Sequence, residues 1–174
     1  AIEFYTKAME QLDEKSASYA DILYRRGGSY ERIKKYKLSD IDLINSLKIV
    51  PNDPYVTNYL AYSWLERNYK IEESLDMLQE AYEQKKNDPY IIDSIGWANY
   101  LIKDYQKAEK YLLRALELMP NDPIVNDHYG DIMWKLNRKL EAQYYWLSVL
   151  DSEDAEDEIK ENIALKLILG PKEL

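Results

Sequence analysis

The tripeptide Asn-Asp-Pro occurs three times in this chain, at residues 52–54, 87–89 and 121–123. Its prolines therefore follow one another at intervals of 35 and 34 residues. Between successive prolines lie two stretches in which apolar or small residues recur every three or four positions, the pattern of an amphipathic helix. A period of this length built from two such helices is typical of a helical solenoid, whose units bury their apolar faces against their neighbours.

The same tripeptide predicts where helices begin. Asp53, Asp88 and Asp122 can each accept hydrogen bonds from the first backbone N–H groups of a helix, and the proline that follows suits the first helical position. In the best-formed unit, residues 89–122, a turn around residues 103–104 separates two helical patterns. The recurrent unit is thus a helix, a tight turn and a second helix.

These units resemble tetratricopeptide repeats. That family has a small residue near the middle of the first helix, an Ala or Ser early and late in the second, and a Pro after it. The small first-helix residues here are Gly27, Ala61, Gly96 and Gly130. The second-helix positions hold Ser39 and Ser46, Ser74 and Ala81, Ala108 and Ala115, and Ala142 with Val149. Pro51 and Pro120 close two units, whereas Lys86 and Asp154 replace the proline in the other two.

The resemblance implies an all-α fold: a right-handed α-α superhelix, or TPR solenoid, with flanking helices at both ends. We assign four repeats to residues 20–154, divided as 20–53, 54–88, 89–122 and 123–154, with the extra residue of the second in the turn at 68–70. Outside the third repeat the helices are expected near 20–33, 37–49, 55–67, 71–84, 124–136 and 139–150. Residues 16–19 are predicted to be a turn. Residues 155–174 are assigned as a C-terminal capping helix that Gly170-Pro171 ends.

Residues 1–15 resemble the second helix of a repeat, with Ala1 and Ala8 at the two small positions. We therefore expect the chain to start inside a repeat and to be a piece of a longer protein. The alternative is an N-terminal capping helix, which solenoids need. The chain opens without methionine and without a visible secretory signal, so its location is left open between the bacterial cytoplasm and the periplasm.

Composition narrows the class of partner. The net charge of −9, from 32 acidic and 23 basic residues, argues against nucleic acid and against direct contact with an anionic membrane. No apolar run approaches the roughly 20 residues of a membrane span. Without cysteine there is no disulfide or thiolate metal site. His128 is the single histidine, and one histidine alone does not supply enough ligands for a metal ion. No cofactor or metal is expected, and His128 is interpreted as an exposed or inter-helix residue.

Two segments whose residue types carry chemistry in other proteins are interpreted as structural here. Residues 25–29 (RRGGS) lack the spacing of a phosphate-binding loop and fall within a predicted helix, where Gly27 is expected to let two helices approach. The acidic run 151–158 lacks calcium-loop spacing and is interpreted as a solvated linker. Neither a nucleophile elbow nor a distinguished carboxylate pair is present, so the chain is not predicted to be an enzyme.

The resemblance also implies a binding surface, because the first helices of this family line the inner groove. The first-helix positions that point into that groove are occupied here by Tyr55, Asn58, Tyr62, Tyr90, Asp93, Trp97, Tyr100, Asp127, Asp131 and Trp134. Aromatic side chains suit protein interfaces, and the acids could pair with Lys or Arg on a partner. The alternative is that Trp97 and Trp134 pack between repeats.

These expectations favour a non-catalytic scaffold or adaptor that holds a segment of another protein with basic and apolar side chains. Repeats two to four also look like those of bacterial tetratricopeptide proteins, some of which are envelope adaptors for a processing protease. Two alternatives stay open: a regulatory or substrate-docking domain of a larger enzyme, and a self-assembly module acting through the end helices. The oligomeric state is not predicted.

Overall fold

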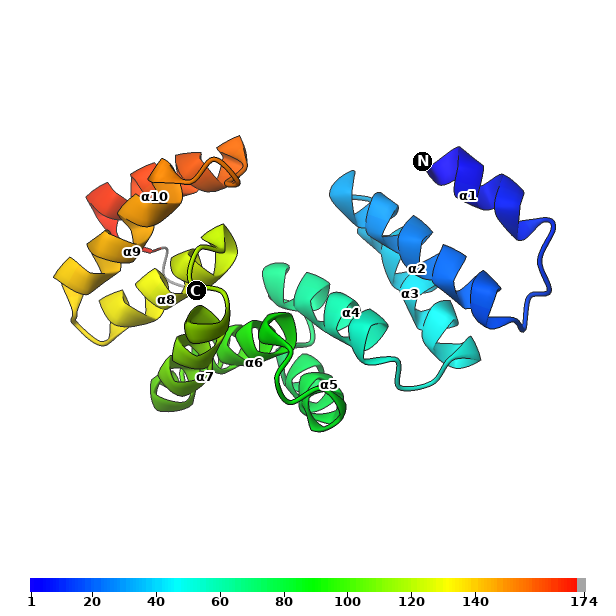
Figure 1. Ribbon diagram of the computed structural model, residues 1–174, viewed down its shortest axis with the longest axis horizontal. Coiled ribbons are helices and arrows are strands. Elements are labelled where there is room, and N and C mark those ends of the chain that lie inside the picture. The colour runs from blue at the N-terminus through cyan, green and yellow to red at the C-terminus, as the bar shows by residue number, and fades with distance from the viewer. Residues whose placement is uncertain (172–174) are drawn as a thin grey trace. The chain divides into compact units, whose positions relative to one another are not determined.

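The computed structural model describes residues 1–171, which form ten α-helices and no strand (Figure 1). The helices are α1 (Ile2–Met9), α2 (Ala17–Arg32), α3 (Tyr36–Ile49), α4 (Pro54–Glu66), α5 (Ile71–Gln84), α6 (Pro89–Leu101), α7 (Tyr105–Leu118), α8 (Pro123–Lys135), α9 (Lys139–Asp151) and α10 (Asp157–Leu169). The chain divides into two compact units, one of residues 1–85 and one that begins at residue 86. The all-α prediction is confirmed.

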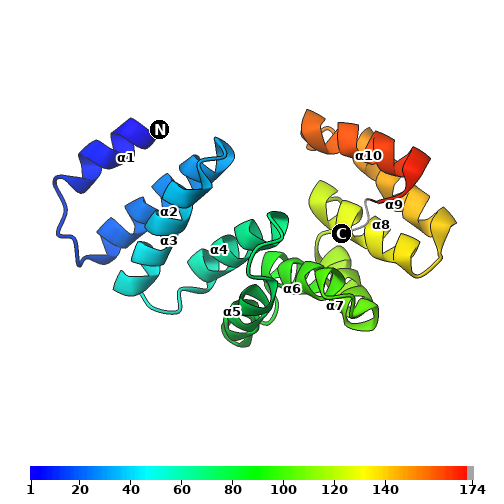
Figure 2. The ribbon, with the colours of Figure 1, turned by 180° about the vertical axis from the view of Figure 1, so that it is seen from behind.

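In the first unit, α2 pairs with α3 and α4 pairs with α5, while α1 packs on α2 (Figures 1 and 2). The two pairs are joined through α3 and α4. Leu43, Val56, Leu60 and Trp64 form the buried core of that junction. The Trp64 indole N–H donates to Asp40 over 3.1 Å, so the largest core side chain is also satisfied as a hydrogen-bond donor.

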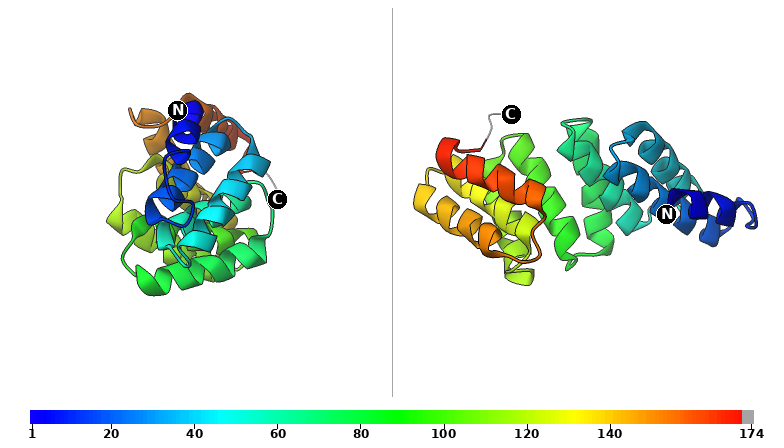
Figure 3. Two further views of the ribbon diagram at one scale, coloured as in Figure 1. Left: turned by 90° about the vertical axis from the view of Figure 1, so that its right-hand side faces the viewer. Right: turned by 90° about the horizontal axis from the view of Figure 1, so that it is seen from above.

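In the second unit, α6 pairs with α7 and α8 with α9, and α10 lies beside α9 (Figure 3). Its core is continuous from the α6–α7 pair to α10 and includes Leu112, Tyr129, Ile132, Trp146 and Ile163. Each helix pair thus contributes one buried face to a core shared with the next helix. This is the packing expected of stacked helical repeats.

Small residues allow the helices of a pair to approach closely. A Cβ atom added to Gly96 would lie 2.6 Å from Leu112 Cγ, and one added to Gly130 would lie 2.4 Å from Trp146 Nε1. Both separations are shorter than carbon atoms tolerate, so only glycine fits. The expectation that the small first-helix residues mark close helix contacts is confirmed at these two positions.

The Asn-Asp-Pro tripeptides begin helices as predicted. Oδ1 of Asp53, Asp88 and Asp122 accepts from two backbone N–H groups each, and a proline occupies the start of α4, α6 and α8. The turn between α4 and α5 has four residues where the other intra-pair turns have three. Asn68 and Lys70 both adopt the left-handed conformation there, which confirms where the extra residue lies.

The N-terminal prediction needs correction. The helix within residues 1–15 ends at Met9, and α2 begins at Ala17, inside the segment 16–19 that was predicted to be a turn. Asp13 forms the intervening turn by accepting from the Lys15 N–H, and the Ser16 hydroxyl caps α2 by accepting from the Tyr19 N–H. Short polar side chains favour such local bonds, so Ser16 marked a helix start rather than a turn.

Candidate binding surface

Three first helices leave a large apolar side chain exposed directly after their initial proline. Tyr55 on α4 is 50% exposed, Tyr90 on α6 is 60% exposed and Ile124 on α8 is 40% exposed. We call these the post-proline residues. The sequence-based set contains Tyr55 and Tyr90 but not Ile124, although its position after the third Asn-Asp-Pro is the same. Its shared position in the repeat is the reason to consider Ile124 together with Tyr55 and Tyr90.

Two of the post-proline residues line clefts whose walls are both apolar and acidic. In the second unit, Ile124 borders a cleft of about 590 Å³ with Met119, Ile159, Asp154 and Glu156 among its other lining residues. In the first unit, Tyr55 borders a cleft of about 350 Å³ lined also by Asp21, Tyr24, Val50 and Asp53. Such walls suit a ligand that combines apolar groups with positive charge.

The other two predicted site residues of the first unit, Asn58 and Tyr62, are partly buried on α4. They share that helix with Tyr55 and belong to the first unit, whereas the remaining predicted site residues belong to the second.

In the second unit, Trp97 forms the middle of an aromatic stack. Its ring lies 4.7 Å from that of Tyr100 and 4.2 Å from that of His128, with interplanar angles of 9° and 8°. His128 Nδ1 lies 2.9 Å from one oxygen of Asp93 and 3.1 Å from the other. Asp93, Tyr100 and His128 are all buried, so this group joins α6 to α8 and presents little but Trp97 to solvent.

Of the two interpretations of His128, the inter-helix one is confirmed, since its partners lie on α6, and exposure is wrong, since the residue is buried. Burial, together with the nearby Asp131 carboxylate, raises the pKa of Tyr100 above its ordinary value. The Tyr100 hydroxyl therefore stays protonated throughout the physiological range. Trp97 and Tyr100 act as packing side chains between the two first helices.

The acids of α8 are paired within the chain. Lys166 on α10 donates to Asp127 over 2.6 Å and to Asp131 over 2.9 Å, and all three side chains are largely buried. Burial and the nearby Asp127 raise the pKa of Asp131 to about 6 against the opposing effect of Lys166. Burial lowers the pKa of Lys166, but the two carboxylates outweigh it and the net pKa is raised. The cation that we expected from a partner is here supplied by α10.

Trp134 lies beside these acids and is partly covered. Its ring is 5.5 Å from that of Trp146, and the Lys139 ammonium lies 4.8 Å from the ring centre. A Cβ atom on Gly170 would lie 2.7 Å from Trp134, so the backbone that follows α10 passes directly against the indole. The structure brings Asp127, Asp131 and Trp134 together under the C-terminal end of α10.

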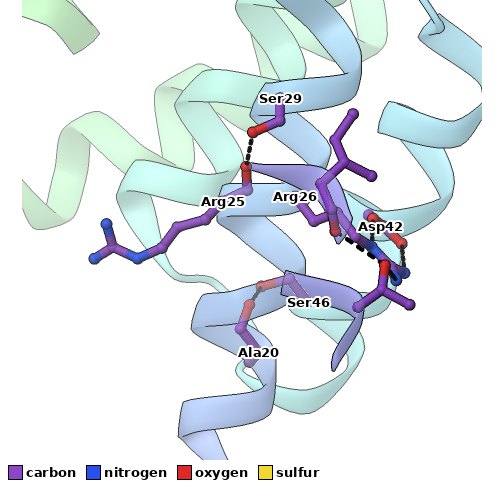
Figure 4. A network of polar contacts seen from close by, with 8 residues as sticks. Ala20, Arg25, Arg26, Ser29, Asp42 and Ser46 are labelled. Carbon is purple, nitrogen blue, oxygen red and sulfur yellow. Dashed lines mark hydrogen bonds and ion pairs between the residues drawn. The ribbon is translucent and has the colours of Figure 1, made fainter. Parts of the chain in front are cut away.

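The Arg-Arg-Gly-Gly-Ser segment lies inside α2 and is structural (Figure 4). Figure 4 shows Arg26 directed at Asp42 on α3, with which it makes two hydrogen bonds of 2.7 and 2.8 Å, while Arg25 points away. The Asp42 carboxylate raises the pKa of Arg26 further. A Cβ atom on Gly27 would lie 3.0 Å from Leu43, which agrees with its predicted role in helix packing.

A family model described as "Tetratricopeptide repeat" matches residues 89–122, the third of the predicted repeats. The chain is similar to a "TPR repeat-containing protein" of Pseudomonas aeruginosa, with 29% identity over 128 residues, covering 72% of this chain and 22% of that protein. Residues 89–122 are therefore a tetratricopeptide repeat. The chain spans about a fifth of that relative's length.

Two solved structures share the fold of this chain. A thermophilic TPR protein of Thermus thermophilus has a TM-score of 0.76 at 17% identity, covering 97% of this chain and 89% of that one. MamA of Desulfovibrio magneticus has a TM-score of 0.65 at 16% identity, covering 90% and 97%. At these identities the likeness shows the fold alone. No helix within residues 1–171 is long and apolar enough to cross a membrane.

Proposed function

We propose that this chain is a protein-binding segment in which each unit holds a peptide or helix of another protein against the post-proline residues of its own first helices. Tetratricopeptide repeats generally act as scaffolds for protein–protein interaction. The particular surface is our inference, and it rests on one observation: Tyr55, Tyr90 and Ile124 are large, apolar and 40–60% exposed at one position of three repeats. Exposed aromatic side chains of this kind are enriched among the residues that dominate interface energies.

Charge supports a basic partner. The net charge is −9, and Asp53, Asp154 and Glu156 lie beside post-proline residues in the two clefts. A partner segment with alternating apolar and Lys or Arg side chains would fill the apolar walls and pair with the acids. Rim charges of this type chiefly accelerate association, so binding should weaken as salt is added.

The finer role that we propose is that of an adaptor for a bacterial envelope protease. It is supported by the resemblance of repeats two to four to bacterial tetratricopeptide proteins, some of which are such adaptors. The rival proposal is a docking domain of a larger enzyme. It is favoured by 30% identity over 83 residues to "Protein O-mannosyl-transferase TMTC3" of mouse, a match that covers 9% of that protein.

A capture experiment with matched variants tests the surface. The chain would be immobilised, exposed to lysate of its source cell, and its bound proteins quantified by mass spectrometry. The test variant is Tyr55→Ala/Tyr90→Ala/Ile124→Ala. The control is Leu140→Ala/Tyr144→Ala/Leu147→Ala, which removes three side chains of 82%, 68% and 50% exposure from the second helix α9.

We expect the test variant to lose at least nine-tenths of a specific partner and the control variant to retain it, with equal helicity by circular dichroism. Recovery of a protease as that partner would support the adaptor role. Equal retention by both variants would contradict the proposed surface. Loss with the control alone would assign binding to α9 instead.

A further inference from the structure

The two acids of α8 form a compact cation-binding site, which we call the lysine site. Asp127 and Asp131 stand one helical turn apart, and the Lys166 ammonium reaches both, with hydrogen bonds of 2.6 and 2.9 Å. The side chain of Lys166 is 17% exposed, and that of Asp131 is 4% exposed. Bringing a like-charged pair this close in a poorly hydrated place is unfavourable unless a cation is present. The site therefore requires a cation, which α10 provides.

Helix α10 shows which helix pattern fits over this site. Ile163 is completely buried, and Ile159 and Leu167 pack against the same core cluster. With Lys166, these residues occupy one face at spacings of four, three and one, so the ammonium arrives at the acids beside an apolar stripe. Any helix with this arrangement of three apolar residues and one lysine has the required chemistry.

The attachment of α10 is weaker than that of its neighbours. Ile163 is its only fully buried residue among the thirteen, whereas α8, of the same length, buries eight. Its N-cap, Glu156, makes no side-chain cap bond, while Asp122 caps α8. On its outer face Leu165, Ile168 and Leu169 are 51%, 78% and 77% exposed. Segments with few buried contacts open at lower free energy than the rest of a fold.

If α10 only shielded the core from solvent, a buried ion pair would bring no advantage in stability, because apolar residues of similar size stabilise a packed helix at least as well. What the pair provides is selectivity, since a helix without a cation at this point leaves two acids unpaired. We propose that the lysine site binds an amphipathic, lysine-bearing helix of the partner protein, and that α10 is a built-in occupant which that helix displaces. This rests on the proposed scaffold function and specifies the chemistry of its partner.

A peptide exchange experiment tests the proposal on the full chain. The probe is a fluorescein-labelled synthetic peptide with the sequence of residues 157–171, and binding is followed by fluorescence anisotropy. In the wild type the tethered α10 competes at high effective concentration, so we expect weak binding. Lys166→Glu places a third negative charge at the site and drives α10 out, and Lys166→Met removes the ammonium with less disturbance. We expect both variants to bind the peptide at least tenfold more tightly than wild type.

Control variants distinguish loss of the ion pairs at the lysine site from a general weakening of the packing of α10. Lys160→Glu makes the same charge change elsewhere on α10 and should leave peptide affinity within twofold of wild type. Adding Asp127→Asn/Asp131→Asn to Lys166→Met should abolish the gain. So should replacing the lysine at position 166 of the peptide by methionine. Unchanged affinity in both Lys166 variants, or equal binding of both peptides, would overturn the proposal.

Hydrogen exchange of the wild type gives a second readout that needs no variant. Amides of α10 should exchange at least tenfold faster than those of α8, because α10 opens separately. Equal exchange in the two helices would mean that α10 is a fixed part of the core, and the proposal would be wrong. The scaffold function is tested by the post-proline residues, so its failure would leave the peptide result intact and the two outcomes distinguishable.

Discussion

Asp93, Asp127 and Asp131 occupy first-helix positions that the family resemblance directs into a groove, yet in this chain all three meet a cation or histidine of a later helix. Asp93 is paired with His128 on α8, and the other two are paired with Lys166 on α10. A carboxylate at these positions therefore fastens a first helix to a later helix, which is α8 for Asp93 and α10 for Asp127 and Asp131. The same position can bind a partner only where the next helix is absent or displaced.

Titration of Asp131 gives a prediction at this scale. Its pKa is about 6 in the folded chain, raised from 3.8 mainly by burial. Because the folded chain binds the Asp131 proton more tightly than the unfolded chain does, protonation of Asp131 stabilises the fold. This contribution to the free energy of unfolding is complete below pH 3.8 and is lost as the pH rises through about 6. Asn cannot titrate, so the unfolding free energy of the wild type should fall relative to Asp131→Asn over this window, by an amount on the order of 1 to 3 kcal/mol.

Urea denaturation of both proteins between pH 3.5 and pH 7.5 measures this difference. The control is Asp154→Asn, which changes an exposed acid in the linker before α10. A constant difference between wild type and Asp131→Asn across the range would show that burial of Asp131 does not perturb its titration.

The first helices α4, α6 and α8 share one initiation device, because each starts at an Asp cap followed by proline. The cap is local: each Asp accepts from the two N–H groups that follow its own proline. These elements therefore form for reasons contained within four residues of sequence. Helix α10, whose N-cap makes no such bond, depends more on packing.

Removal of one cap should have a measurable local cost. Asp122→Ala removes the acceptor for the Ile124 and Val125 N–H groups, whose bonds to Asp122 are 2.9 and 3.1 Å long. We expect the free energy of unfolding to fall by about 1 kcal/mol. Asn121→Ala, a change to an exposed residue in the same turn, should cost less than about 0.5 kcal/mol. Equal losses in the two variants by urea denaturation would contradict the role of the cap.

Features whose causes lie within a few residues of sequence could be predicted, and features that depend on distant contacts could not. Helix type, the start of α4, α6 and α8, and the four-residue turn at Asn68 and Lys70 could be predicted because their causes lie close together in the chain. Helix α2 begins at Ala17, before the expected start near residue 20, because the Ser16 hydroxyl caps it and a serine is equally common in turns. The pairing of Lys166 with Asp127, 39 residues away, could not be predicted, since it depends on how α10 packs in three dimensions.

At the scale of the whole molecule, the chain consists of two compact units of stacked helices and spans a minor part of its Pseudomonas aeruginosa relative. Each unit carries post-proline residues that its own packing leaves exposed. A protein built from such units presents exposed side chains on helices that are already folded. No part of that surface has to become ordered when a partner binds. That preformed character reduces the entropic cost of binding a partner segment.

The most direct test of the central claim is photo-crosslinking in the source cell. A benzoylphenylalanine would replace Tyr90 in the longest natural form of the protein, and, in a separate strain, Tyr144, an exposed tyrosine on the second helix α9. We predict a discrete crosslinked product from position 90 that contains a second protein, and none of the same mass from position 144. The absence of a product from position 90, or the same product from both positions, would contradict the account that the first helices are the binding surface.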